Sequence, residues 1–172
     1  KRRLLTLKAK LTGNNKRVAL IEFNEVNIIF LKKYLADKNF ANRWKSLRKL
    51  VALPLVTTKS ENSYELLEPW VQWASVHNGL TATQHKIFRL GDINSSNHPQ
   101  LFEVIESKGY SVGCISAMNA SNKLKSPAYF IPDPWTITKT DNSFISKSVY
   151  LALYQAVNDN ASGKITKSTL LR

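Results

Sequence analysis

A six-residue apolar run, VALIEF at residues 18–23, lies between the cations Lys16 and Arg17 and the polar sequence NEVN. A short continuous apolar run with polar boundaries is typical of a strand that is buried on both faces of a parallel sheet. This run therefore predicts a first strand and restricts the chain to folds in which such a strand can be covered on both sides.

The rest of the chain alternates between helical and extended patterns. Apolar residues recur at helical spacing in segments 26–35, 41–49, 68–77, 100–109 and 144–158. Extended patterns cover residues 51–58, 110–116 and 127–134, and Pro54 restricts the first of them to an edge or interrupted strand. In the first helix the expected inward side chains are Val26, Ile29, Phe30, Tyr34 and Leu35. We expect an α/β fold with a mainly parallel sheet flanked by helices.

Positive charge is unevenly distributed along the chain. The 172 residues include 25 Lys and Arg against 12 Asp and Glu, a net charge of +13. Seven basic residues precede residue 18 without an acidic one, whereas residues 51–172 hold 11 basic and 9 acidic residues. We expect a basic arm (1–17), an α/β domain (18–158) and a polar tail (159–172). Solvated helix faces and a basic tail account for the charge; the alternative is an anionic surface bound through residues 1–17.

Other partners and compartments are less favoured by the sequence. A nucleic-acid partner is disfavoured, because the charge is not spread through the domain and no RNA-binding aromatic signature is present. No run approaches the roughly 18 apolar residues of a membrane helix, so we expect a soluble or peripheral protein. The one cysteine, Cys114, is expected to be a buried thiol, which is compatible with the cytoplasm.

Oxygen-bearing side chains follow the predicted first strand: Glu22, Asn24, Glu25 and Asn27. Functional groups of open α/β sheets collect at the carboxyl ends of strands, and carboxylate and amide oxygens are suited to hard cations. Asn24 and Glu25 are therefore candidate metal ligands. The competing interpretation is that one of them caps the next helix.

The segment from Glu68 to Asp92 carries the other candidates. His77 and His85 are separated by eight residues, a weak metal signal, and Trp70 and Trp73 are expected in the core. Arg89 with Asp92 fits either anion binding or a surface ion pair. Ser75 has no base next to it in the sequence and no G-x-S-x-G motif, so a serine-hydrolase triad is not supported.

The order of these motifs resembles the amino-terminal part of the alkaline-phosphatase-like superfamily, which includes phosphodiesterases and sulfatases. The resemblance covers roughly residues 18–135 and rests on three features: Trp73–Gly79 for W-x-S-x-x-T-G, His85 for the His of H-G, and Gly109–Tyr110 before the next strand. It implies a metal-dependent hydrolase or transferase acting on phosphate or sulfate esters. It also implies divalent metal ions, with zinc, manganese or magnesium as candidates.

The resemblance also assigns residues. Asn24 or Glu25 stands where members have a metal-binding Asp, and Asn78, His85 and Arg89 are candidate substrate-binding residues. The position of the usual hydroxyl or thiol nucleophile falls on Glu68, Pro69 and Trp70, which makes Glu68 the candidate catalytic residue. We expect Asn24 and Glu25 to face the same crevice as the start of the Glu68 helix.

The remaining metal ligands of such enzymes lie downstream of a region like this one. We therefore expect the chain to be the front part of a larger domain, and to show no ester turnover by itself. A divergent or inactive relative is included in this interpretation. The alternative is a non-catalytic α/β binding or scaffold module.

Overall fold

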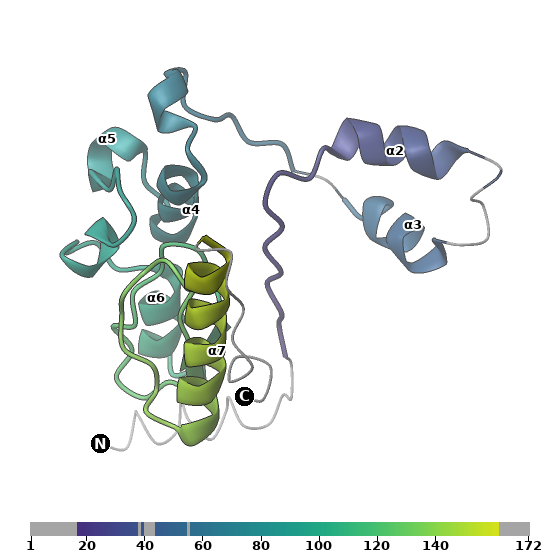
Figure 1. Ribbon diagram of the computed structural model, residues 1–172. Coiled ribbons are helices and arrows are strands. Elements are labelled where there is room, and N and C mark those ends of the chain that lie inside the picture. The colour runs from purple at the N-terminus through teal and green to yellow at the C-terminus, as the bar shows by residue number, and fades with distance from the viewer. Residues whose placement is uncertain (1–16, 38, 40–43, 55, 162–172) are drawn as a thin grey trace, which may run out of the picture. The chain divides into compact units, whose positions relative to one another are not determined.

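The computed structural model describes residues 17–37, 39, 44–54 and 56–161 (Figure 1). The chain divides into two compact units: unit 1 is Lys1–Val18 with Glu61–Arg172, and unit 2 is Ala19–Ser60. This division falls inside the single α/β domain expected for residues 18–158. Each unit is described by itself below.

Unit 1 contains the sheet. Strands β1 (Gly113–Ile115) and β2 (Tyr129–Ile131) pair in parallel, with Cys114 opposite Phe130. Both of these side chains are buried, in a core completed by Phe102, Val112, Ala120 and Leu124. The ring of Tyr129 lies where a Cβ atom at position 113 would be, which explains a glycine there. The α/β class and a parallel pairing are therefore confirmed for the described residues.

The described part of unit 1 also contains helices. They are η2 (Tyr64–Leu66), α4 (Pro69–Asn78), α5 (Ala82–His85), η3 (Asp92–Asn94), α6 (Leu101–Ser107) and α7 (Phe144–Ala161). Helix α7 packs against β2, and α4 contacts both α5 and α6. A second small core consists of Ala74, Ile87 and Ile93. The three longer helices predicted in this unit are thus confirmed, with shifts of a few residues at their ends.

In the described part of unit 2 the helices are α2 (Ile28–Ala36) and α3 (Lys45–Val51). The side chain of Asn27 caps α2 by accepting a hydrogen bond from the Phe30 N–H at 2.8 Å. Leu35 is the buried residue of α2, and α3 has none. The expected inward stripe of the first helix is therefore wrong in part, because Val26, Ile29, Phe30 and Tyr34 are exposed.

Residues 18–23 correct the first prediction. They form no strand, and the side chains of Val18 and Phe23 are 94% and 61% exposed. An apolar run becomes a strand only when neighbouring strands accept its backbone hydrogen bonds, and periodicity cannot show whether such neighbours exist. The edge strand predicted at residues 51–58 is also wrong where the structure describes it, since α3 ends at Val51 and no described residue from 52 to 58 lies in a strand.

Among the described residues, no helix has the length and apolar character needed to cross a membrane.

Candidate functional site

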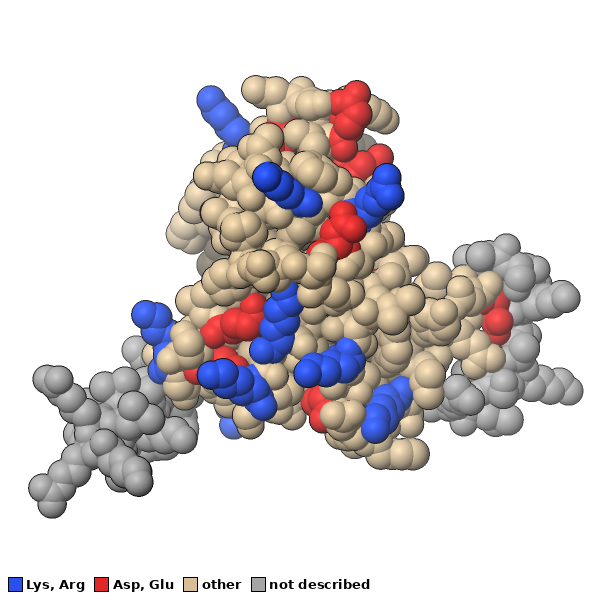
Figure 2. Space-filling view, turned by 90° about the vertical axis from the view of Figure 1, so that its left-hand side faces the viewer, with Lys and Arg blue, Asp and Glu red and all other residues tan. Residues whose placement is uncertain are grey.

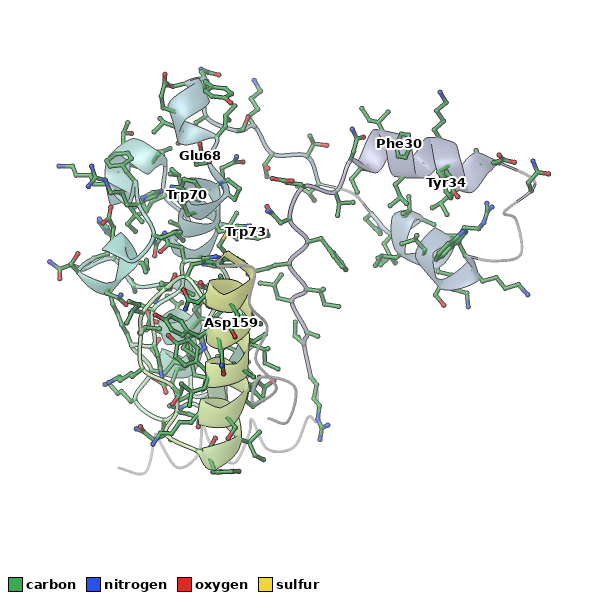
Figure 3. The ribbon with its side chains drawn as sticks, in the orientation of Figure 1. Phe30, Tyr34, Glu68, Trp70, Trp73 and Asp159 are labelled. Atoms are coloured by element: carbon green, nitrogen blue, oxygen red, sulfur yellow. The ribbon has the colours of Figure 1, made fainter. Side chains whose placement is uncertain are left out.

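The first turn of α4 places Glu68. Glu68 is the N-cap residue, with extended backbone, and Pro69 occupies the first helical position, where its missing N–H costs nothing. The Glu68 carbonyl accepts hydrogen bonds from Val71 N–H and Gln72 N–H, whereas its side chain makes no capping bond. Its half-buried carboxylate lies at the start of a ten-residue helix, at the positive end of the helix dipole (Figure 3).

A tight reversal connects α4 to α5. Gly79 ends α4 in the left-handed region, with φ of 66°, where a residue without Cβ is least strained. Thr81 and Gln84 form a reciprocal capping box that starts α5, and Lys86 ends it, again with left-handed backbone. This geometry brings His85 back to α4.

His85 forms a hydrogen-bonded pair with Ser75 of α4. Its Nε2 lies 2.9 Å from Ser75 Oγ, and its Nδ1 accepts the Ile87 N–H at 2.9 Å. Since Nδ1 is an acceptor, the neutral ring carries its proton on Nε2 and donates it to Ser75, whose hydroxyl donates to the Val71 carbonyl at 3.3 Å. In this arrangement His85 cannot take the Ser75 proton. The pair therefore ties α5 to α4 and does not activate a nucleophile.

The surroundings of His85 keep it neutral. The ring is 4% exposed, and burial lowers the pKa of His85 below its ordinary value of 6.5. An electrostatic interaction with His98 lowers the pKa of His85 further, whereas the carboxylate of Glu61 acts in the opposite direction. That carboxylate also accepts the Ala82 N–H at the start of α5, at 2.8 Å.

Asn78 is the last residue of α4, whereas Arg89 follows α5 and lies on a segment beside the first turn of α4. Asn78 closes the helix, about 15 Å along its axis from Glu68. Both of its amide atoms are buried without a hydrogen-bond partner among the described residues. The Arg89 side chain is exposed, and its backbone N–H donates to the Asp92 carboxylate at 3.0 Å. The three candidate substrate-binding residues therefore do not converge on one point.

Asn119 joins the Arg89 segment to the first turn of α4. Its buried side-chain amide donates to the carbonyls of Trp70 and Arg89 and accepts the Gly91 N–H. The indole of Trp70 also donates to the Phe88 carbonyl at 3.1 Å. Glu68 and Arg89 are thus on segments held together at the amino end of α4.

Asp133 in turn fixes Asn119, and neither residue is among the candidates predicted from the sequence. One oxygen of this buried carboxylate accepts the Asn119 N–H at 3.0 Å, and the other accepts the N–H groups of Trp135 and Thr136. The one signal in the sequence is an Asp between two prolines, Pro132 and Pro134, in an otherwise apolar stretch. Such a residue is a candidate for a buried turn-forming carboxylate.

Asn24 and Glu25 belong to unit 2. They form an exposed turn in which Glu25 has a φ of 59°, and the cap of α2 is Asn27 and neither of these two residues. The side chains of Asn24 and Glu25 are therefore not used as caps. The expectation that they share a crevice with the Glu68 helix concerns two different units and stays a prediction.

In the part of the chain that the structure describes, the donor set for a resident metal ion is incomplete. Among the described residues, no group of three or more His, Cys, Asp and Glu side chains gathers where it could hold an ion. Asn24 and Glu25 are two ligand side chains, an amide and a carboxylate, which is fewer than zinc or calcium takes from a protein.

No protein-family model, no curated protein and no solved structure matches this chain.

Proposed function

We propose that this chain supplies part of a metal-dependent hydrolase or transferase for phosphate or sulfate esters, of the alkaline-phosphatase-like kind. The proposal rests on the sequence resemblance and on one structural observation. The motif residues from Trp73 to His85, which are weak signals individually, form one continuous local structure of helix, left-handed turn and returning helix, joined by the Ser75–His85 hydrogen bond.

In this proposal the residues have separate tasks. Glu68 is the candidate carboxylate at the amino end of α4, beside a segment that carries the exposed guanidinium of Arg89, which is suited to an anionic ester. Asn78 offers an amide that no described residue satisfies. His85 is a positioning residue, because both of its ring nitrogens are engaged within the protein. Asn24 and Glu25 would contribute oxygen ligands to one divalent ion.

A bound divalent ion would polarise the ester and stabilise charge on the attacking and leaving oxygens. The described residues offer at most part of one metal site, and Glu68 is the oxygen-bearing side chain in the nucleophile position. We therefore expect esters to bind in a metal-dependent way without turnover by this chain alone.

The test supplies the chain with zinc, manganese or magnesium and measures binding and hydrolysis of aryl phosphate, phosphodiester and aryl sulfate. Glu68→Gln should weaken metal-dependent ester binding, whereas Glu65→Gln, an exposed neighbour in η2, should leave it unchanged. Ester binding that is the same with and without metal would contradict the proposal. Metal-dependent turnover by the chain would contradict its restriction to a partial site.

The alternative is a non-catalytic α/β binding module. The observation that favours it is the direction of the Ser75–His85 hydrogen bond, which leaves this hydroxyl without a base. In this alternative, residues 1–17 bind an anionic surface. Residues 1–16 of this segment lie outside the described residues. Absence of both metal binding and ester binding in the experiment above would make the binding module the better account.

A further inference from the structure

Unit 2 concentrates positive charge on its helical part. Residues 26–53 contain seven Lys and Arg and one acidic residue, Asp37, a net charge of +6. The lysines of α2 and α3 that the structure describes are all exposed: Lys32, Lys33, Lys45 and Lys49. By contrast, basic and acidic side chains are interspersed on the face of the protein shown in Figure 2.

The same part of the chain exposes large apolar side chains. Ile29 is 83% exposed and Phe30 is 65% exposed, and the others are Tyr34, Trp44, Leu50 and Leu53. Phe30 and Tyr34, four residues apart on α2, stack with their ring centroids 6.4 Å apart (Figure 3). Single exposed apolar residues are ordinary, but six within 25 residues of a small helical unit indicate a contact surface.

Cations and apolar side chains are neighbours on α2. Ile29 is followed at three and four residues by Lys32 and Lys33, and residues at these spacings lie side by side on a helix surface. An apolar side chain flanked by two long cationic ones fits an interface whose outer layer is anionic and whose inner layer is apolar. The lysine stems can then lie along the apolar layer while their ammonium groups stay at its edge.

From these observations we infer that helices α2 and α3 of unit 2 dock onto the surface of an anionic lipid bilayer, with Ile29 and Phe30 entering the headgroup region and the lysines contacting lipid phosphates. This inference goes beyond the proposed hydrolase function and does not depend on it. A nucleic acid would attract the same cations. A nucleic-acid partner would leave the aliphatic Ile29, Leu50 and Leu53 without a role, because protein surfaces that bind single-stranded nucleic acid combine basic groups with aromatic side chains that stack on the bases. The interfacial region of a bilayer accommodates aliphatic and aromatic side chains together.

The experiment measures co-sedimentation of the whole chain with vesicles of mixed phosphatidylcholine and phosphatidylserine, and with vesicles of phosphatidylcholine alone. We expect binding to the mixed vesicles that weakens with salt. Lys32→Gln with Lys33→Gln should weaken it roughly 30-fold, from about 1 kcal/mol for each basic residue near such a surface. The matched control is Lys8→Gln with Lys10→Gln, which changes the net charge equally in the basic arm and should have much less effect.

A second pair of variants tests insertion. Ile29→Ser should weaken vesicle binding roughly tenfold, because burial of this side chain is lost. Ile145→Ser, at a similarly exposed position of α7 in unit 1, should not change it.

Several outcomes would overturn the inference. One is absence of binding to mixed vesicles. Another is that the Lys8→Gln, Lys10→Gln control loses as much vesicle binding as Lys32→Gln with Lys33→Gln, which would show that net charge alone attracts the chain to the vesicles. Unchanged binding of Ile29→Ser together with tighter binding to a DNA duplex would indicate a nucleic-acid surface instead. A fall of several degrees in the melting temperature of Ile29→Ser, without vesicle binding by the parent chain, would show that this side chain is buried against protein in solution.

Discussion

His85 shows how a single ring determines the chemistry available around α4. Its neutral tautomer donates to Ser75, so the pair holds two helices together. Because burial lowers the pKa of His85 in the folded state, the unfolded chain binds the proton more readily. Stability should therefore decline as the pH falls below the ordinary value of 6.5 and toward the lower folded pKa.

This predicts a pH-dependent difference between the parent chain and His85→Gln. Urea unfolding at several pH values between about 7.5 and 5 should show the parent losing more free energy of unfolding than the variant as the pH falls, since the variant lacks the titrating ring. Parallel pH profiles for the two proteins would mean that His85 titrates equally in the folded and unfolded states.

Asn119 gives a second prediction at this scale. Asn119→Ala removes the amide that bonds Trp70, Arg89 and Gly91 and leaves at a φ of 50° an alanine, which tolerates left-handed backbone less well than asparagine does. We expect a loss of about 2 to 4 kcal/mol in the free energy of unfolding, because three backbone groups lose their partner. Asn119→Gly loses the same bonds without the backbone strain, so it should be about 1 kcal/mol less damaging. Equal stability of Asn119→Ala and the parent would contradict the role of this amide.

Sequence reasoning located part of this site. The helix expected over residues 68–77 follows from local spacing rules and is confirmed as α4 (Pro69–Asn78). The Ser75–His85 pair and the Asn119–Asp133 pair were missed, because they join residues ten or more positions apart through side chains whose direction depends on tertiary packing. Local patterns contain no information about such contacts.

At the scale of elements, Asp141 connects β2 to α7. Its carboxylate accepts hydrogen bonds from the Phe130 N–H of β2, from the Ser143 N–H and from the Ser146 hydroxyl in the first turn of α7. Partial burial acts to raise its pKa, but these hydrogen bonds outweigh it and hold the pKa of Asp141 well below its usual value of 3.8.

Asp141→Asn should therefore lower the stability of the chain by about 1 kcal/mol near neutral pH. The stabilisation from Asp141 is present above the ordinary carboxyl pKa and is lost as the pH falls through the folded value, so the variant should also show a weaker loss of stability in acid. Thermal unfolding followed by circular dichroism at pH 7 and near pH 3 measures both effects. Equal stability of Asp141→Asn and the parent at pH 7 would contradict this role of Asp141.

Helices were better predicted than strands. The helices α2, α4, α6 and α7 follow from spacing, caps and breakers within each segment. The strand expected at residues 18–23 failed because a strand needs a hydrogen-bonding neighbour from elsewhere in the chain. The prediction that the apolar residues of α2 point inward failed for a related reason. Periodicity shows which side chains share a face, but it does not show whether anything covers that face.

At the scale of the whole molecule, the basic arm of residues 1–17 should be dispensable for folding. It lacks apolar periodicity, and like charges in such a segment repel one another. Deletion of the arm should leave the melting temperature nearly unchanged, as measured by calorimetry. A loss of several degrees would mean that the arm packs as a structural element.

The most direct test of the proposed function is to measure manganese binding by the whole chain with isothermal titration calorimetry. If Asn24 and Glu25 contribute to a metal site, the chain should bind the ion and Glu25→Gln should weaken binding at least tenfold, because a charged oxygen ligand is lost. The matched control is Glu22→Gln, a nearby carboxylate outside the proposed ligand pair, which should bind like the parent. Absence of binding, or equal binding by the parent and Glu25→Gln, would contradict the account.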